Sequence, residues 1–347
     1  MPDTSSRIRV KVLNRTPPNM WLDMYFPGGI PSWGRCDFTF DWDAKDYDWL
    51  VVYEDLPPKD GERRAMREEI LPCPRENSIL LTTEPPTIKV YGKGLTSQYG
   101  CVLTSQPEWG LPHRNRIFRP QAMHRHYGLD MSGKGNSYSF DRMVEQPPLE
   151  KSKTLSTVCS VKQQQHTLHN QRFQFTQDLK ELIPEMEIYG HGVRPMADKS
   201  EALDEYAYHL AIENFIGENH FTEKLTDVFL GAALPFYCGC PNAADYFPEA
   251  SFIPLDINDV PGSAEIIQRA IHDNEYEKRL PAILEARKLA LYRYSMFGVI
   301  SEEIEKRHVE NDTRKTGASI CSRWLYLKKH PFRALQFAWE RRRLKAF

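Results

Sequence analysis

The densest group of residues that could do chemistry lies between positions 206 and 239. An apolar run ends there at Glu213, a polar loop follows, and a helix is predicted to begin after Thr222, a typical N-cap residue. Glu223 and Lys224 occupy the first turn of that helix. A helix N-terminus offers free N–H groups and a partial positive charge, and Lys224 adds a full charge, so the segment could hold phosphate. The alternative is a capped surface helix with a solvated lysine.

Two further residues stand at the boundaries of predicted elements. Glu84 follows a predicted strand, Ile79–Leu81, just before two prolines. By its pattern alone it fits a solvated loop acid. Arg172 begins a predicted helix that extends to Leu182. By its pattern alone it fits an ordinary surface position.

Three spacings superficially resemble metal-ligand patterns: Asp41 with Asp43, Cys238 with Cys240, and His124 with His126. The aspartates lie in an acidic, aromatic loop, the cysteines are too close together without further partners, and the histidines lack companion ligands. We therefore predict no metal site. The sequence also lacks a Walker loop and a G-x-G-x-x-G fingerprint, which argues against an ATPase or a dinucleotide dehydrogenase.

The elements that must position these residues alternate between strands and helices. The second half of the chain shows this most clearly, with predicted elements at residues 154–161, 172–182, 187–189, 200–205, 208–212, 222–232, 234–237 and 263–273. Such alternation indicates an α/β fold with doubly wound parallel sheets. A long helical stretch is predicted for residues 275–297, which either starts or kinks at Pro281. A proline-containing linker at 146–153 suggests domains at 1–150 and 151–300, followed by a tail at 301–347.

Length and composition set limits on the class of protein. The 347 residues suggest two domains, and 45 basic against 47 acidic residues give a net charge of −2, so we expect no nucleic-acid partner. The seven cysteines are scattered and odd in number, which indicates a reducing compartment. The N-terminal residues lack the apolar core of a signal peptide, and no run approaches the length of a membrane span. We therefore expect a cytoplasmic location.

The chemistry-bearing segment resembles the signature of glycosyltransferase family 10, the alpha-1,3-fucosyltransferases, in a bacterial form. The matching elements occur in order, as A-I-E-N at Ala211–Asn214, T-E-K at Thr222–Lys224, and L-P-F-Y-C-G at Leu234–Gly239. The likeness continues to Ser251–Leu255. Where the family often has tyrosine two residues before T-E-K, this chain has His220. The first half resembles the family more weakly, mainly through Glu84.

The resemblance implies a GT-B fold, in which two Rossmann-like domains face a cleft. Residues 1–150 would bind the acceptor, and residues 151–300 would bind GDP-fucose. The implied reaction transfers L-fucose with inversion to a glycan hydroxyl, in an alpha-1,3 linkage to a GlcNAc-type sugar of a surface polysaccharide or lipid-linked precursor. No metal or other cofactor is implied. Glu84 would be the catalytic base, and the donor would be bound by Arg172, Asn214, His220, Glu223 and Lys224. Alternatives are a different GDP-sugar donor or a non-catalytic nucleotide- or glycan-binding module.

The C-terminal residues Arg323–Phe347 carry eight basic residues, one acidic residue and six aromatic residues. Basic side chains interleaved with tryptophan and phenylalanine suit the interface of an anionic membrane. We therefore expect peripheral association with the inner membrane. The alternative is a helical lid that packs on the domains.

Overall fold

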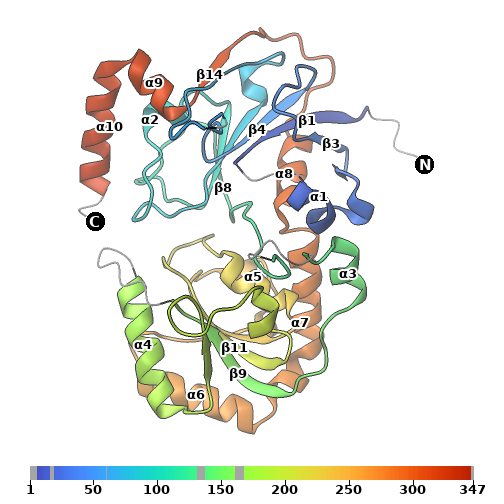
Figure 1. Ribbon diagram of the computed structural model, residues 1–347, viewed down its shortest axis with the longest axis vertical. Coiled ribbons are helices and arrows are strands. Elements are labelled where there is room, and N and C mark those ends of the chain that lie inside the picture. Colours follow the sequence, from blue (N-terminus) through green and yellow to red (C-terminus); the bar gives the residue numbers. More distant parts are fainter. Residues whose placement is uncertain (1–5, 16–18, 60, 131–136, 161–167, 345–347) are drawn as a thin grey trace. The chain divides into compact units, whose positions relative to one another are not determined.

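The computed structural model describes residues 6–15, 19–59, 61–130, 137–160 and 168–344. The chain divides into two compact units (Figure 1). Unit 1 consists of Met1–Ala122 together with Met296–Phe347, and unit 2 consists of Met123–Ser295. Each unit is built around its own sheet of mainly parallel strands. The predicted α/β class with two Rossmann-like parts is therefore confirmed.

The sheet of unit 1 has the strand order β2-β3-β1-β4-β6-β7-β8 within the described residues. All neighbours pair in parallel except β2 and β3. The strands are β1 (Ile8–Leu13), β2 (Ser32–Trp33), β3 (Cys36–Thr39), β4 (Trp49–Tyr53), β6 (Ser78–Leu81), β7 (Cys101–Thr104) and β8 (Arg116–Phe118). The central strands β4, β6 and β7 are almost wholly buried and apolar, as parallel strands covered on both faces must be.

Helices and a small antiparallel pair complete unit 1. The pair joins β5 (Glu68–Ile70) to β14 (Ser319–Cys321). The α-helices are α1 (Asn19–Tyr25), α2 (Lys93–Thr96), α8 (Met296–Glu305), α9 (Arg323–Lys329) and α10 (Pro331–Leu344). Short 3₁₀ turns lie at Pro27–Gly29 and Arg75–Asn77. Phe297 of α8 packs its ring against Phe26, 4.4 Å between centroids, so the chain returns to this unit after unit 2.

Unit 2 has a fully parallel sheet of order β10-β9-β11-β12-β13 in the described residues. Its strands are β9 (Lys153–Val158), β10 (Glu187–Tyr189), β11 (Tyr206–Ile212), β12 (Leu234–Cys238) and β13 (Ile253–Pro254). Its α-helices are α3 (Phe140–Glu145), α4 (His169–Leu182), α5 (Glu223–Leu230), α6 (Val260–His272) and α7 (Glu275–Leu291), with 3₁₀ turns at Lys199–Ala202, Ala243–Asp245 and Glu249–Ser251. Phe175 and Leu179 of α4 and Ile267 of α6 share one buried cluster with the strands.

The division between the units differs from the predicted boundaries at residues 150 and 300. Residues 123–150 belong to unit 2, because Tyr127 donates its hydroxyl to Asp204 at 2.8 Å and the Gly128 N–H donates to Asp198 at 2.9 Å. Residues 301–347 form no separate tail domain, because β14 pairs with β5 and α8 enters the core of unit 1. Both connections are long-range contacts that local patterning does not reveal.

Two predicted helices have different limits in the structure. The stretch 275–297 is not one helix: α7 ends at Leu291 and α8 begins at Met296, while Pro281 lies inside α7. The element predicted at residues 200–205 is a 3₁₀ turn at Lys199–Ala202, and its N-cap is Asp198. The Asp198 carboxylate accepts the Ser200 N–H at 2.8 Å, which fixes the start of the turn earlier in the chain.

Candidate functional site

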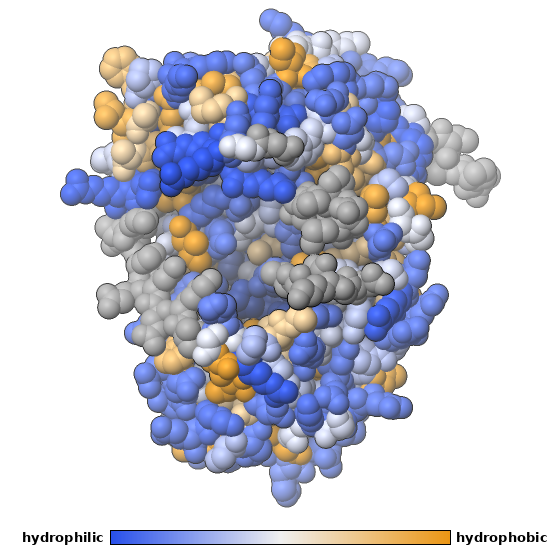
Figure 2. Space-filling model, in the orientation of Figure 1, coloured by the Kyte–Doolittle hydropathy of each residue, from blue (hydrophilic) through white to orange (hydrophobic). Residues whose placement is uncertain are grey.

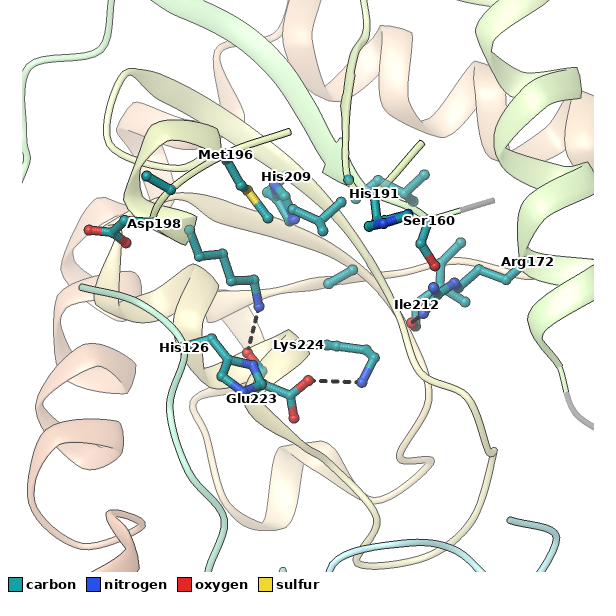
Figure 3. Close-up of a pocket in the computed structure, with 16 residues that line it drawn as sticks. His126, Ser160, Arg172, His191, Met196, Asp198, His209, Ile212, Glu223 and Lys224 are labelled. Carbon is teal, nitrogen blue, oxygen red and sulfur yellow. Dashed lines mark hydrogen bonds and ion pairs between the residues drawn. The ribbon is translucent and has the colours of Figure 1, made fainter. Parts of the chain in front are cut away.

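A cavity of about 270 Å³ opens at the carboxyl edge of the unit 2 sheet (Figure 3). Residues at or just beyond the ends of β9, β10 and β11 line it, and so do the first turns of α4 and α5. Ligands of parallel α/β folds bind at this edge. Three of the predicted donor residues line the cavity, namely Arg172, Glu223 and Lys224. Figure 3 shows Arg172 on the wall formed by α4, with Glu223 and Lys224 coming from α5.

The N-terminus of α5 is built on a buried carboxylate. Glu213, which follows β11 and is fully buried, accepts the Thr222 N–H at 2.8 Å and the Thr222 hydroxyl at 2.7 Å. Thr222 is the N-cap, as predicted, and accepts the N–H of Lys224 at 3.2 Å. Burial raises the pKa of Glu213, while the nearby Lys224 opposes that shift. The glutamate of the I-E-N motif therefore holds the helix start in place rather than facing the cavity.

Glu223 and Lys224 form an ion pair at the cavity wall. The Lys224 Nζ atom lies 3.0 Å from the Glu223 carboxylate and 3.8 Å from that of Glu213. Burial alone would lower the pKa of Lys224, but the two carboxylates outweigh it and raise that pKa. Burial alone would raise the pKa of Glu223, but Lys224, His126 and Lys199 outweigh it and lower that pKa. Both side chains therefore stay charged at neutral pH.

Among the lining cations Arg172, Lys199 and Lys224, the two lysines form ion pairs with carboxylates, whereas the described residues give Arg172 none. Its Nη1 atom donates to the Asn214 side-chain oxygen at 2.8 Å and, more weakly, to the Ile212 carbonyl at 3.4 Å. Its buried Nε atom has no hydrogen-bond partner among the described residues. A buried donor of this kind is costly unless an acceptor is supplied, and a phosphate oxygen would supply one. Asn214 thus orients Arg172 and does not itself line the cavity.

The structure adds a second buried ion pair, which the sequence did not identify. Lys199 lines the cavity, and its Nζ atom lies 3.0 Å from Asp227 and 3.1 Å from the Glu223 carbonyl. Asp227 also accepts the N–H of His126, another lining residue, at 3.1 Å. Asp227 lies on the buried face of α5, four residues after Glu223. A carboxylate at such a position is the sequence signal that could have suggested a cationic partner.

His220 lies outside the lining of the cavity. It is buried, and its ring packs edge-on against Phe215, 5.2 Å between centroids. Burial lowers its pKa to about 3, so it is neutral at physiological pH. The histidine that does line the cavity from β11 is His209, whose Nδ1 atom lies 2.8 Å from the Ser156 hydroxyl.

Glu84 belongs to unit 1. It follows β6 at the carboxyl edge of that sheet, as predicted, and is half-buried. The N–H of Glu84 approaches the Tyr91 hydroxyl at 3.4 Å, and its carbonyl accepts the Gln106 side chain at 2.7 Å. The backbone of Glu84 is therefore fixed on both sides.

The aspartate and cysteine pairs with metal-like spacing have structural roles. The N–H of Asp43 donates to the Asp41 side chain at 2.9 Å, which forms a local turn. Cys238 and Cys240 are buried free thiols, as are the other five cysteines. In the described residues, no group of three or more histidine, cysteine or acidic side chains is placed to hold a metal ion.

The parallel sheet, the helix N-terminus and the cations at its carboxyl edge define unit 2 as a Rossmann-like domain equipped to bind an anionic ligand. Residues 148–276 match the model of the family described as glycosyltransferase family 10 (fucosyltransferase), C-terminal part. This segment contains β9 to β13 and every lining residue of the cavity except His126. This segment is therefore similar to glycosyltransferase family 10, the family whose signature its motifs resemble.

Individual proteins show the same similarity. Over 56 residues the chain is 36% identical to alpha-(1,3)-fucosyltransferase FucT of Helicobacter pylori, a stretch that is 16% of this chain and 12% of the relative's length. The similarity to a solved alpha1,3-fucosyltransferase extends over 89% of this chain and 93% of the solved chain, with 15% identity and a TM-score of 0.48. The similarity to an alpha1,3-fucosyltransferase solved with GDP-fucose extends over 90% of this chain and 95% of the solved chain, with 15% identity and a TM-score of 0.46.

Proposed function

We propose that the chain is a fucosyltransferase that moves L-fucose from GDP-fucose to a glycan hydroxyl with inversion at the anomeric carbon. The observation that carries the proposal is the buried Nε atom of Arg172 beside the α5 N-terminus, which has no hydrogen-bond partner among the described residues and lies inside the segment that matches family 10. In this proposal the units act in the GT-B manner, with the donor on unit 2 and the acceptor on unit 1. The name of the Helicobacter pylori relative supports an alpha-1,3 linkage. The acceptor that we propose is a GlcNAc-type sugar.

The leaving diphosphate gains charge as the glycosidic bond breaks, so its stabilisation is the main demand on the site. Arg172 would supply a fork of donors, Lys224 a compact charge, and α5 its free N–H groups. These protein cations replace the charge that a divalent ion supplies in other transferases, so we propose that no metal is needed. Glu223 keeps Lys224 in place and would meet a sugar hydroxyl at the cavity wall.

The acceptor hydroxyl must lose a proton, and we propose Glu84 as the general base. The test measures the release of the nucleoside diphosphate from GDP-fucose, GDP-mannose and UDP-GlcNAc, with and without EDTA. We expect release from GDP-fucose, insensitive to EDTA, and a loss of about 100-fold in Glu84→Ala with GDP binding retained. Glu108→Ala, which removes an exposed carboxylate of the same unit, is the control.

Each other outcome points to an alternative. Faster release from GDP-mannose would indicate another GDP-sugar donor. Nucleotide binding without release from any donor would indicate a non-catalytic binding module. A full loss in EDTA that Mn²⁺ restores would contradict metal independence, and near-normal rates in Glu84→Ala would remove Glu84 from the mechanism.

We further propose that α10 associates with the cytoplasmic face of an anionic membrane, where a lipid-linked acceptor would be found. Phe332, Leu335 and Trp339, at helical spacings i, i+3 and i+7, are 82%, 70% and 60% exposed. Figure 2 shows hydrophobic side chains standing among hydrophilic ones over this helix, at the upper left. Arg341–Arg343 follow in its last turn. Among the described residues, no helix has the length and apolar content needed to cross a bilayer.

The preceding helix α9 packs on unit 1 and is not a free appendage. Lys329 pairs with Glu68 at 2.8 Å, and the Arg323 N–H donates to Asp55 at 3.1 Å. The ring of Tyr326 lies so close to Gly94 that an added Cβ there would be 2.6 Å from it. Removal of all residues from 323 onward would therefore also disturb unit 1, so the membrane proposal is better tested by surface substitutions on α10.

A further inference from the structure

Hydrogen bonds with the side chains of Gln106, Tyr91 and Glu54 hold the segment that carries Glu84. It runs from Thr83 to Tyr91, between β6 and α2, and forms a turn in which the Lys89 N–H donates to the Pro85 carbonyl at 2.9 Å. The Gln106 side chain donates to the carbonyls of both Glu84 and Lys89, at 2.7 and 3.0 Å. Gln106 therefore ties the two ends of the turn together.

The buried Tyr91 hydroxyl makes hydrogen bonds at the start of the segment. It accepts the N–H of Thr83 at 2.9 Å and that of Glu84 at 3.4 Å, and it donates to the Glu54 carboxylate at 3.0 Å. One donor and two acceptor positions are thereby all used. Complete burial raises the pKa of Tyr91, so the phenol remains a donor at every physiological pH.

Glu54 receives three donors from this one segment. Besides Tyr91, the Thr83 hydroxyl donates to Glu54, and the Lys89 Nζ atom lies 2.8 Å away. Burial alone would raise the pKa of Glu54, but Lys89 and the two hydroxyls outweigh it and lower that pKa. The carboxylate is thus kept ionised as an acceptor, which makes it a poor proton-accepting base and a good anchor.

The backbone of Glu54 is strained. Its φ is +67°, in the left-handed region that is sterically unfavourable for a non-glycine residue. Glu54 directly follows β4, which pairs in parallel with β6, so the two strand ends place Glu54 beside the segment that carries Glu84. Such strain persists where surrounding contacts fix the residue, and it is concentrated at functional sites.

We propose that Glu54 is the positioning residue for Glu84: through Thr83, Lys89 and Tyr91 it fixes the turn that aims the catalytic carboxylate. This proposal rests on the proposed fucosyltransferase function. Misplacement of a base by about 1 Å costs on the order of 100-fold in rate, while donor binding on unit 2 should not change. Loss of the anchor should therefore lower kcat and leave the KM for GDP-fucose nearly constant.

The experiment compares Glu54→Ala, Glu54→Gln and Tyr91→Phe with Tyr99→Phe. Tyr99 is the matched control, because it is buried in the same cluster and its hydroxyl has no hydrogen-bond partner in the described part of the chain. We measure kcat, KM for GDP-fucose, and hydrogen exchange of the peptide that covers residues 83–91. We expect kcat to fall about 10- to 100-fold in Glu54→Ala and Tyr91→Phe, with exchange faster in that peptide. Glu54→Gln keeps two of the three contacts and should recover part of the loss.

The outcomes separate this proposal from the proposed function. Turnover within 2-fold of wild type in Glu54→Ala and Tyr91→Phe, or an equal loss in Tyr99→Phe, overturns the positioning role. If the wild-type protein transfers no fucose, the proposed function fails. Hydrogen exchange then still tests whether Glu54 fixes residues 83–91. Unchanged exchange of this peptide in both folded variants rejects that role. Tyr91→Phe removes only one oxygen atom, so this variant should still fold and can test the proposal if Glu54→Ala does not fold.

Discussion

Arg172 shows how burial turns an ordinary side chain into part of a site. On the surface its charge would be solvated, but here Asn214 fixes one nitrogen and the Nε atom is left without an acceptor among the described residues. A buried donor that lacks a partner destabilises the unliganded protein by about 1–3 kcal/mol. Part of that cost is recovered when an anion binds, which favours the bound state.

We predict that Arg172→Ala and Lys224→Ala each weaken GDP binding by about 10- to 100-fold, because each removes a charge-assisted contact of about 1.5–3 kcal/mol. Titration calorimetry measures the affinity. Arg269→Ala, which removes an exposed arginine of the same unit, should bind GDP as the wild type does. Unchanged affinity in both cavity variants would show that the diphosphate binds elsewhere.

Asp204 provides a pH-dependent contribution to stability. Burial raises its pKa to about 6, above the value of about 3.9 in an unfolded chain, despite the hydrogen bond from Tyr127. Its stabilising contribution is therefore present below about pH 4 and is lost as the pH rises through 6. We predict that Asp204→Asn gains thermal stability relative to wild type between pH 4 and 7. Melting curves of both proteins across this range measure the difference, and a constant difference would contradict the prediction.

At the scale of elements, strand ends and helix starts carry the site because their backbone groups are fixed by the fold. Glu213 follows β11 and caps the start of α5 through Thr222, so two elements share one buried carboxylate. In unit 1, a buried charged side chain of β1 likewise fixes a neighbouring loop. Lys11, fully buried, donates to Glu69 at 2.8 Å and to the Trp42 and Ala44 carbonyls, which fixes the loop before β4.

We predict that Lys11→Met lowers the free energy of unfolding by about 3 kcal/mol or more, because Glu69 would be left buried without its lysine. Urea denaturation followed by tryptophan fluorescence measures the change. The double variant Lys11→Met/Glu69→Gln should recover a large part of the loss, since the buried charge is then absent. A double variant no better than the single one would show that the lysine acts by another route.

At the scale of the whole molecule, the chain begins unit 1, builds unit 2 and returns to unit 1, so the C-terminal helices are parts of unit 1. Of these, α10 has an apolar face that the described residues leave exposed. Tryptophan and phenylalanine beside arginines favour the headgroup region of an anionic bilayer. We therefore propose the exposed apolar face of α10 as the membrane contact.

We predict that the wild-type protein co-sediments with phosphatidylglycerol vesicles at low salt and less at high salt, because screening weakens the basic contribution. Replacing Phe332, Leu335 and Trp339 together by serine should lower the bound fraction several-fold. The control replaces three other exposed apolar residues of unit 1, Ile30, Ile70 and Val309, by serine. Equal binding by both triple variants would reject α10 as the membrane contact.

The sequence by itself determined those features that depend on neighbours along the chain. The strand before Glu84, the N-cap at Thr222 and the alternation that predicts an α/β fold follow from local patterning and capping chemistry. The ordered motifs around Thr222–Lys224 were also specific enough to predict the family of residues 148–276.

The tertiary structure decided which charged side chains form ion pairs. The pairing of Lys199 with Asp227 spans 28 residues, and that of Lys11 with Glu69 spans 58, so no local pattern could show them. His220, placed near the donor by its motif position, is buried against Phe215, while Lys199 lines the cavity instead. Sequence determines the types of the charged groups, but burial and the partners brought by the fold set their pKa values and leave the Nε atom of Arg172 without an acceptor in the described part of the chain.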